Sequence, residues 1–437
     1  MTSLTEVPGA VVDDAGLRHV GSPLAEQRRL ASGSALAPLG DRRVLSVDGP
    51  DRLSWLDSLS SQALTHLPAG VSTEMLILDP NGRVEHAASV IDDGETAWLI
   101  VDAADAEPLA AWLGRMRFRL RVEVRDRSDE VFVVGGTRAA VAGLSALAPA
   151  GVPVVWVDPW PDVSPGGWAY ARVEDHPGAE RDWAEAVVDA TEFDRIVAAA
   201  VAGEVALAGR EAVEALRVAA WRPRVAVDAD ERLLPHEMDW LRTAVRLSKG
   251  CYRGQETVAK VHNLGHPPRR VVALQLDGSD SVLPARGDVV RVGDDAIGAV
   301  TLVAVHFEEG PIALALVKRT APADVTYVVD TADGPIAAAV ETVVPSDAGA
   351  TAGVPRLPRL GRRRAAEKPL ADRADFRLLD YRETQGRVDL HVSVGILSQG
   401  GVGHYDDAFP TGAALVKVSG SSFIASLGGS QGPGLAY

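Results

Sequence analysis

A single cysteine stands in the segment KGCYRGQET, residues 249–257, and no other cysteine occurs among the 437 residues of the chain. Gly250 and Gly254 flank Cys251 and permit a tight backbone path that larger residues would block. The following QETVAKV has the composition of a short helix. The spacing therefore predicts that Cys251 lies just before a helix N-terminus.

The neighbours of Cys251 could alter its chemistry. Amide groups exposed at a helix N-terminus, together with the cations Lys249 and Arg253, favour the thiolate over the thiol. Tyr252 could stack on a flat ligand and close a pocket around it. A reactive or redox-sensitive cysteine is one hypothesis. A small buried apolar residue whose charged neighbours face water is the other.

The sequence gives little support for a metal site or for a common catalytic motif. With one cysteine, the chain has no Cys-x-x-Cys ligand pair for zinc or an iron–sulfur centre. His262 and His266 have helical spacing, but Gly265 and Pro267 interrupt that helix, so we expect satisfied loop histidines and no metal site. The sequence contains no P-loop, dinucleotide-binding or nucleophile-elbow motif.

The charge balance excludes some classes of partner. Lys and Arg number 44 against 60 Asp and Glu, which gives a net charge of −16. This argues against a broad surface for nucleic acid or for an anionic membrane, although a local basic pocket is compatible with it. The longest uncharged run, residues 139–157, is interrupted by Gly and Pro, so we expect no membrane span. The scarcity of thiols and an N-terminus without a secretory signal favour the cytoplasm. A monomer is expected.

The order of patterns along the chain predicts the α+β class with several packed units. Residues 1–24 lack periodicity and are expected to form a flexible N-terminal arm. Residues 25–265 alternate short strands with helices, whereas residues 266–345 are all strand and predict a C-terminal β-barrel. Residues 346–375, rich in Pro, Ala and Arg, indicate a linker. Residues 376–437 form an extension of unknown role that is expected to be weakly ordered.

Three local patterns allow finer predictions. The turn Asp79-Pro80-Asn81-Gly82 predicts a hairpin between two strands. The stretch DWAEAVVDATEFDRIVAAAVAGEVAL, residues 182–207, is predicted to be a long amphipathic helical stretch. Asp92 and Asp93 occur in turn-rich sequence and are expected to be solvated loop carboxylates.

The cysteine segment and its surroundings closely resemble the signature region of the YgfZ family of folate-binding proteins. That family is related to the T-protein (aminomethyltransferase) of the glycine cleavage system. The resemblance rests on KGCYRGQE, on LRVAAWRPRVAVDADERLLPHEMDW before it and on TVAKVHNLGHPPRRVVAL after it. The segments VDGPDRLSWLDSLSSQ and LDPNGRVEHAA extend it over roughly residues 25 to 345.

The resemblance implies a T-protein-like multidomain ring around a central hole that binds tetrahydrofolate, with a β-barrel as its last part. It also implies a role in making or repairing iron–sulfur clusters on client enzymes, including one that modifies tRNA, and it makes Cys251 the functional cysteine. Arg217 is the candidate contact to the glutamate tail of the folate, because guanidinium pairs well with carboxylate. The other cofactor-binding candidates are Lys249, Tyr252, Arg253, Gln255 and Glu256.

Three functions follow from this resemblance. The first is a tetrahydrofolate-binding accessory protein for iron–sulfur enzymes. The second is a folate-dependent one-carbon transferase, which a carboxylate such as Asp102 or Asp105 at the central hole would favour. The third is an interaction scaffold with a vestigial folate site. Trp221 stands where relatives usually have Gly, and an indole that blocks the hole would favour this third function.

Overall fold

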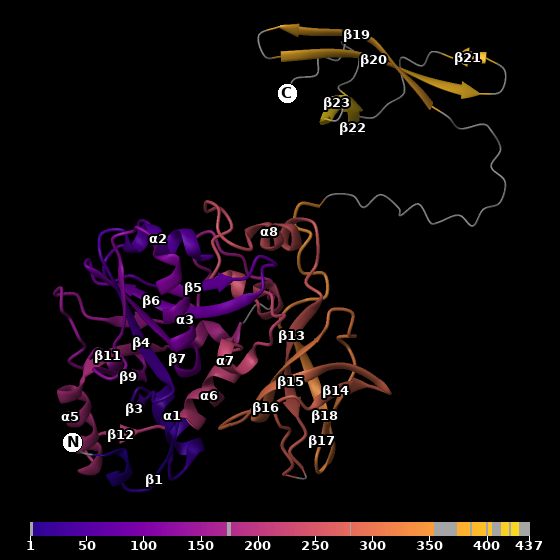
Figure 1. Ribbon diagram of the computed structural model, residues 1–437. Helices are drawn as coiled ribbons and strands as arrows, with labels where there is room; N and C mark the ends of the chain where they lie inside the picture. Colours follow the sequence, from indigo (N-terminus) through magenta and orange to yellow (C-terminus); the bar gives the residue numbers. More distant parts are fainter. Residues whose placement is uncertain are drawn as a thin grey trace. The chain divides into compact units, whose positions relative to one another are not determined.

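The computed structural model describes residues 3–172, 176–279 and 281–353 of the first part of the chain. Further along it describes residues 374–384, 387–398, 401–403, 412–418 and 421–427. The chain divides into two compact units, Met1–Val354 and Pro355–Tyr437. The first unit contains two five-stranded sheets and a closed barrel, with helices packed around them (Figure 1). Among the described helices, none has the length and apolar character needed to cross a membrane.

The first sheet is antiparallel and has the strand order β5-β6-β7-β4-β8. Two helices pack on it, and their Trp55 and Leu113 side chains join Leu45 and Leu99 of the strands in one buried core. The elements are β4 (Arg42–Asp48), α2 (Arg52–Leu59), β5 (Ser72–Leu78), β6 (Val84–Asp92), β7 (Thr96–Asp102), α3 (Ala103–Met116) and β8 (Glu123–Asp126).

The predicted hairpin joins β5 to β6. The Asp79 carboxylate accepts hydrogen bonds from the amides of Asn81 at 2.7 Å and Arg83 at 2.8 Å. Gly82 has a φ of +79°, a backbone conformation that glycine adopts without strain. The hairpin predicted from the Asp79-Pro80-Asn81-Gly82 turn is therefore confirmed.

The second sheet has the order β10-β11-β9-β3-β12 and is covered on both faces. Ile196 of α5 packs on one face with Val134, whereas Leu30 of α1 packs on the other face with Val133. Successive residues of the same strand thus point to opposite faces. The elements are α1 (Pro23–Ala31), β3 (Ala35–Pro38), β9 (Val131–Gly136), α4 (Arg138–Val141), β10 (Val155–Val157), β11 (Ala184–Asp189), α5 (Ala190–Val201), β12 (Ala206–Leu207) and α6 (Arg210–Ala219).

The expected C-terminal β-barrel and the α+β class are confirmed. The barrel closes because β13 pairs with both β16 and β18, and Leu274, Val300 and Tyr327 are among the side chains that fill it. Its strands are β13 (Arg269–Leu276), β14 (Val289–Val292), β15 (Asp295–His306), β16 (Gly310–Lys318), β17 (Tyr327–Thr331) and β18 (Gly334–Thr342).

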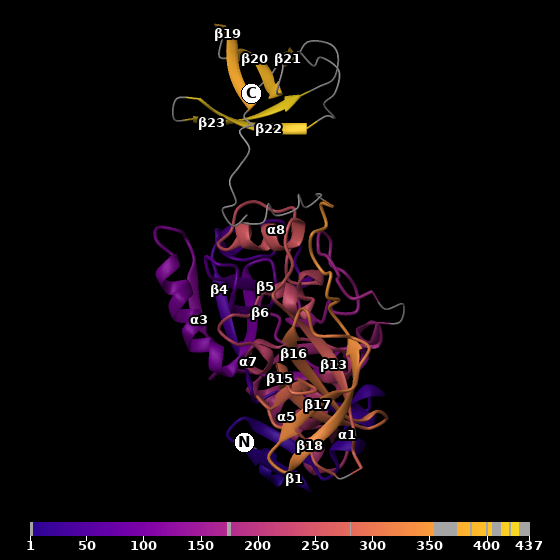
Figure 2. The same ribbon diagram turned by 90° about the vertical axis from the view of Figure 1, so that its right-hand side faces the viewer.

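A connecting segment runs from the second sheet to the barrel and contains α7 (Val225–Asp228) and α8 (Gln255–Asn263). Short 3-10 helices at Pro235–Met238 and Trp240–Arg242 lie between them. Figure 2 shows α7 between α3 and the barrel strand β15. The same segment contains the cysteine signature, whose Gly254 lies against the hairpin of β5 and β6.

The flexible arm expected over residues 1–24 is wrong for the residues that the structure describes. A 3-10 helix (Leu4–Glu6) precedes a hairpin of β1 (Ala10–Asp13) and β2 (Gly16–Val20). Val7 and Leu17 are buried in the core beneath α5. Burial of these side chains fixes the segment, although its sequence shows no periodicity.

Two further predictions are wrong. Residues 182–207 do not form one helical stretch, because β11 occupies Ala184–Asp189 and α5 begins only at Ala190. Asp92 and Asp93 are buried, since Asp92 is held by Arg52 at 2.6 and 2.8 Å and Asp93 accepts from the Trp98 indole at 2.9 Å. Buried partners, and not solvent, satisfy these carboxylates.

The second unit is described by itself. Its strands β19 (Ala374–Thr384), β20 (Arg387–Ser398) and β21 (Gly401–Gly403) pair in that order, and β22 (Gly412–Val418) pairs with β23 (Ser421–Leu427). Most of the proposed linker, residues 354–373, lies outside the described residues, whereas Ala348 near its start is buried in the first unit. Weak order of the extension stays a prediction.

Candidate functional site

The signature loop, residues 249–254, packs against the hairpin of β5 and β6. Gly254 has a φ of +84°, and a Cβ there would lie 2.6 Å from the carbonyl oxygen of Asp79. Across the contact, a Cβ at Gly82 would lie 2.9 Å from the Cβ of Thr257. Nothing lies within 4 Å of a Cβ at Gly250. The tight path predicted from the glycines is therefore confirmed at Gly254 and wrong at Gly250.

Cys251 is exposed and precedes α8, which begins at Gln255. The predicted place before a helix N-terminus is confirmed, and the hypothesis of a small buried cysteine is wrong. Gln255 closes the loop, because its Nε2 donates to the carbonyl of Lys249 at 3.2 Å and its amide donates to the carbonyl of Tyr252 at 3.2 Å. Glu256 is exposed in the first turn of the helix.

Lys249 anchors this loop to the end of α2. Its ammonium donates to the main-chain carbonyls of Asp57, of Ser60 at 2.7 Å and of Gln62 at 2.9 Å. An ammonium has three donors, so these carbonyls use all of them. Burial lowers the pKa of Lys249, and the Asp57 carboxylate at 3.5 Å opposes that effect. The structure thus gives Lys249 a role in holding the loop.

Tyr252 belongs to the core and not to a ligand surface. Its side chain is buried among the apolar residues where the sheets meet the barrel, and burial raises the pKa of its hydroxyl. The Lys249 ammonium lies 5.2 Å from the centre of its ring. Stacking of Tyr252 on a flat ligand would require this packing to open.

Arg217 and Asp102 lie in a buried network of ion pairs. Arg217 donates to Asp228 at 2.7 Å and to Glu214 at 3.0 Å. Asp102 accepts from Arg224 at 2.6 Å and also pairs with Arg42. Burial alone would raise the pKa of Asp102, but the charges of Arg42 and Arg224 bring it below its ordinary value. Neither Arg217 nor Asp102 is free to meet a ligand unless these pairs break.

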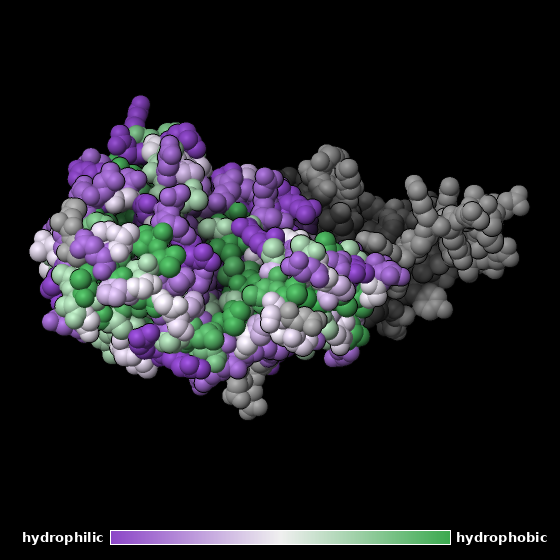
Figure 3. Space-filling model, turned by 90° about the horizontal axis from the view of Figure 1, so that it is seen from below, coloured by the Kyte–Doolittle hydropathy of each residue, from purple (hydrophilic) through white to green (hydrophobic). Residues whose placement is uncertain are grey.

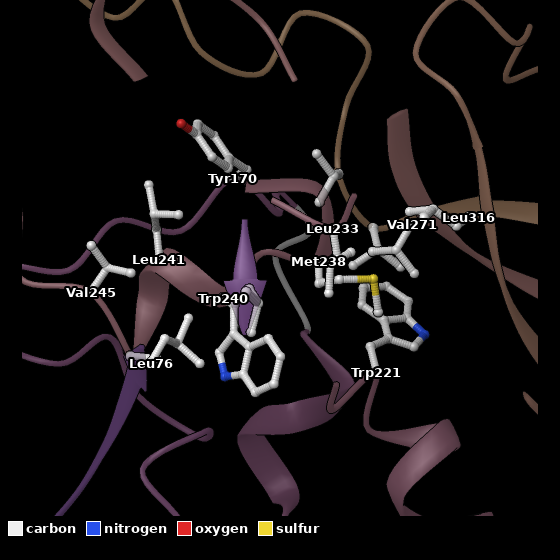
Figure 4. Close-up of a cluster of buried hydrophobic side chains, with 14 of the residues drawn as sticks. Leu76, Tyr170, Trp221, Leu233, Met238, Trp240, Leu241, Val245, Val271 and Leu316 are labelled. Carbon is white, nitrogen blue, oxygen red and sulfur yellow. The ribbon is translucent and has the colours of Figure 1, made fainter. Parts of the chain in front are cut away.

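The region where the two sheets meet the barrel is filled by side chains. Trp221, with a φ of +55°, is buried beside Met238 and close to Val271 (Figure 4). Its indole lies 5.2 Å from the His176 ring, edge to face. Seen from below, hydrophobic residues gather in a recess between the barrel and the part of the first unit that contains the two sheets (Figure 3). Trp221 thus packs inside, and it also borders a cavity of about 180 Å³ between α6 and the barrel.

A cavity of about 740 Å³ lies between β6, α3 and residues 225–231. The signature loop reaches it through Arg253, whose Nη1 lies 2.6 Å from the Glu85 carboxylate. A second cavity, of about 610 Å³, is bordered by Lys249 and Gly250 at the end of α2. The loop that exposes Cys251 therefore borders a cavity on each side. The larger cavity is lined by Asp79, Val84, Glu85, His86, Trp112, Val225, Ala229, Asp230, Glu231 and Arg253.

Beside the larger cavity, Asp105, one of the two carboxylates singled out from the sequence, pairs with His86, which the sequence analysis did not name. His86 Nδ1 lies 2.6 Å from Asp105 Oδ1, while the other carboxylate oxygen of Asp105 is buried without a hydrogen-bond partner. Burial raises the pKa of Asp105, although the hydrogen bond from His86 opposes this. Asp105 thus orients the histidine that borders the cavity. The available signal was a Glu-His pair near the start of the strand that follows the Gly82 turn.

The histidines of the signature region are satisfied, as predicted, but His262 lies in α8 and not in a loop. His262 Nδ1 lies 2.9 Å from the Tyr170 hydroxyl, and His266 Nδ1 lies 2.8 Å from the carbonyl of Ala348. Within the described ranges, no three His, Cys, Asp or Glu side chains gather in a way that could hold a metal ion.

Comparison with protein-family models finds no match. Among solved structures, the crystal structure of the glycine cleavage system aminomethyltransferase T from Bartonella henselae aligns over 78% of this chain and 95% of that chain. The TM-score is 0.59 and the sequence identity is 18%. The chain has a T-protein-like fold. At this identity the likeness establishes the fold alone.

A second similar structure is the heterotetrameric sarcosine oxidase from Corynebacterium sp. U-96 in complex with pyrrole 2-carboxylate. It covers 42% of this chain and 93% of that chain at 14% identity, and its TM-score of 0.24 is too low to carry an argument. Within the T-protein-like fold, the barrel and the first sheet enclose α7, and the signature loop lies against the hairpin of that sheet.

Proposed function

We propose that this chain binds tetrahydrofolate in the 740 Å³ cavity beside β6 and α3. We further propose that it acts, like YgfZ proteins, as an accessory protein for iron–sulfur enzymes in the cytoplasm. Two findings support the proposal. The T-protein-like fold is shared with an aminomethyltransferase of the glycine cleavage system, and the segment KGCYRGQE resembles the YgfZ signature.

The residues of the cavity suit a folate. The pterin ring presents an edge of N–H donors, for which the Glu85 and Asp230 carboxylates are matching acceptors. Trp112 is buried in the core of the first sheet, and the part of its indole that borders the cavity adds an apolar contact for the flat ring. The cavity volume of about 740 Å³ also falls in the range of ligand pockets. The cavity therefore combines carboxylates, part of an aromatic side chain and enough volume for a folate.

One observation carries the proposal. Arg253 of the signature loop pairs with Glu85 at the cavity, and Cys251, two residues earlier, is exposed. A ligand that contacts Glu85 would therefore change the surroundings of Arg253 and of the loop that presents the thiol. We propose that folate binding and the contact of Cys251 with a client enzyme are linked through this loop.

Calorimetric titration of tetrahydrofolate into the full chain tests the binding step. We expect saturable binding, and a Cys251→Ala variant should bind equally well because the thiol lies outside the cavity lining. That variant should fail to restore the activity of an iron–sulfur enzyme in cells that lack this protein. Absence of binding at high micromolar folate would contradict the folate site, and full restoration by Cys251→Ala would contradict the role of the cysteine.

A second candidate function, one-carbon transfer, is favoured by the His86–Asp105 pair. A histidine oriented by a carboxylate can move a proton at a ligand nitrogen. In this reaction the carbon of an aminomethyl thioether donor would form bonds to N5 and N10 of tetrahydrofolate, while its bonds to the amine and to the donor's sulfur break. The two N–H protons of the folate would leave with ammonia and with the donor's thiol. Formation of methylenetetrahydrofolate from an aminomethyl donor, lost in His86→Gln, would support this function. No turnover by the unaltered protein would exclude it for that donor.

A further inference from the structure

The chain between α3 and β8 gathers positive charge on one exposed turn. Residues 115–121 read RMRFRLR, so four arginines stand within seven residues of a chain whose net charge is −16. All four arginines are exposed. Phe118 is 85% exposed and Leu120 is 43% exposed. This segment, hereafter the arginine turn, therefore presents cations and apolar side chains together.

The fold uses part of this positive charge. Arg121 pairs with the Asp51 carboxylate at 2.8 Å. Within the part of the chain that the structure describes, no such partner lies at Arg115, Arg117 or Arg119. Cations at the end of a helix stabilise its dipole, which accounts for Arg115 in the last turn of α3. The effect falls off beyond that turn, so it does not account for Arg119.

Two hydrogen bonds fix the ends of the arginine turn. At its start, the Trp55 indole of α2 donates to the carbonyl of Met116 at 3.2 Å. At its end, the Asp51 carboxylate accepts from the amide of Arg121 at 2.9 Å. A surface that is already ordered loses less conformational entropy when a partner binds to it. The arginine turn is therefore prepared for binding.

Phe118 stands at the bend of this turn. The amide of Leu120 donates to the carbonyl of Arg117 at 3.0 Å, which closes the bend. The φ of Phe118 is +46°, a left-handed conformation that is unfavourable for a bulky side chain. Residues strained in this way cluster at functional sites, where the surrounding contacts hold them. Because the side chain of Phe118 is also exposed, it adds nothing to the core, and contact with a partner would explain both features.

The arginine turn and the signature loop are attached to the two ends of the same helix. Asp51 precedes α2, and the Lys249 ammonium donates to main-chain carbonyls at the other end of that helix. Its eight residues span about 12 Å. Figure 2 shows α3 along one edge of the first unit, running toward the end of the unit at which α8 lies. A partner that covers α2 can therefore contact the arginine turn and reach Cys251.

We infer that the arginine turn docks a client enzyme through an acidic surface of that enzyme, with Phe118 in an apolar recess between the carboxylates. The inference rests on the proposed function, since it names the surface through which the client would meet Cys251. Arginine and aromatic side chains contribute most to binding at protein interfaces, and opposite charges steer the encounter.

The charge of the remaining chain distinguishes between kinds of anionic partner. A nucleic acid or an anionic membrane carries negative charge over an extended area, so it would repel a chain of net charge −16 beyond the arginine turn. An acidic patch on a protein is limited in area and can face the arginine turn alone. A protein partner therefore fits this surface best.

The test varies the charge at Arg117 and Arg119 in cells that lack this protein and measures the restored activity of an iron–sulfur enzyme. The double variants are Arg117→Lys with Arg119→Lys, Arg117→Ser with Arg119→Ser, and Arg117→Glu with Arg119→Glu. We expect the lysine pair to restore nearly full activity and the serine pair to restore less. The glutamate pair should restore at least about tenfold less than the unaltered protein, because like charges repel at an interface.

Phe118→Ser should also lower the restored activity, because it removes the apolar anchor. All of these variants should keep their folate affinity and unfold at nearly the same denaturant concentration as the unaltered protein. The altered side chains are exposed and lie outside the lining of the folate cavity. A loss of restored activity would therefore report on docking.

The matched control is Arg138→Ser with Arg195→Ser, which removes two exposed cations of the second sheet region and changes the net charge as much as the serine pair does. It should restore full activity. Equal restoration by the lysine and glutamate pairs would overturn the inference, while the folate site and the role of Cys251 would stand. If the unaltered protein restores no activity, the proposed function is wrong and this inference falls with it.

A binding assay separates the other anionic partners. The unaltered protein is mixed with single-stranded RNA or with vesicles of phosphatidylglycerol and phosphatidylcholine. We expect no binding to either. Binding to one of them that the glutamate pair loses would overturn the inference, because the arginine turn would then serve a partner other than a protein.

Discussion

Arginines in two regions of this protein have different surroundings. In the buried region, Arg217 contacts Glu214 and Asp228, and Arg222 contacts Glu74 at 2.6 Å and Asp158 at 3.2 Å. At the cavities, Arg253 has one carboxylate partner that is about a third exposed, and Arg286 has carbonyl partners. The buried arginines join parts of the fold, whereas those at the cavities keep donors available. Residue type alone does not distinguish the two roles.

Removal of a buried arginine should have the largest effect. In Arg217→Met, Glu214 and Asp228 lose a partner inside the protein, and an unpaired buried charge is costly. We expect the free energy of unfolding to fall by about 3–5 kcal/mol, measured by chemical denaturation. A loss below about 1 kcal/mol would show that the buried network contributes no more than a surface pair. It would contradict the difference between the buried arginines and those at the cavities.

The pH dependence of stability should show that a buried ionisable side chain without a partner of opposite charge stays neutral. Burial lowers the pKa of His236 to about 4 from an ordinary value of 6.5. Between these values the unfolded chain takes up a proton that the folded chain does not, so the free energy of unfolding falls as the pH falls from about 6.5 to about 4. At roughly 1.4 kcal/mol for each pKa unit, the full effect is about 3 kcal/mol.

His236→Gln should remove this contribution. The measurement is the difference in free energy of unfolding between variant and unaltered protein at several pH values. Burial raises the pKa of Asp239 to about 7, so this group makes the free energy of unfolding change with pH in the opposite direction. Its contribution is the same in both proteins and cancels in the difference. A difference that is constant from pH 7 to pH 4 would contradict the assignment of His236 as a neutral buried group.

The two glycines of the signature loop provide a matched pair. Gly254→Ala should lower the free energy of unfolding by about 1–3 kcal/mol, because the φ of +84° is strained for alanine and its Cβ would meet the carbonyl of Asp79. Gly250→Ala should cost far less, since its Cβ meets nothing within 4 Å. Equal thermal shifts of the two variants would mean that the loop does not depend on its contact with the hairpin.

The smallest effect on stability is expected at the cavity arginine. Arg253→Met removes an ion pair with Glu85 whose two side chains are 36% and 35% exposed. Such pairs contribute less than about 1 kcal/mol, so denaturation curves should nearly coincide with those of the unaltered protein. A loss as large as that of Arg217→Met would place Arg253 with the structural arginines.

The sequence predicted the features that depend on neighbouring residues. The Asp79–Gly82 turn, the helix after Gly254 and the strands of the barrel follow from local turn chemistry and alternation. Strand β11 was mistaken for part of a helix because no Gly or Pro separates AEAVVD from the helix that follows it. Asp189, whose carboxylate accepts from the amide of Glu192 at 2.8 Å, was a readable helix start.

The roles of the signature residues could not be predicted from neighbouring residues, because these roles depend on partners far away in the sequence. The carbonyls that hold Lys249 come from the end of α2, almost 190 positions earlier in the chain. Tyr252 is buried by residues from the first sheet and from the barrel. The larger cavity likewise combines β6, α3, residues 225–231 and Arg253, which only the tertiary fold brings together.

The affinity of the full chain for tetrahydrofolate in Arg253→Met and Trp112→Leu tests the central claim most directly. Both residues border the 740 Å³ cavity, and Arg253 also orients Glu85. Arg253→Met should fold normally, whereas Trp112→Leu should fold with lower stability because Trp112 is buried in the core of the first sheet. Each variant should bind at least about tenfold more weakly, a loss of about 1.4 kcal/mol, while Cys251→Ala keeps the unaltered affinity. Unchanged binding in both cavity variants would show that the folate, if bound, lies elsewhere in the molecule.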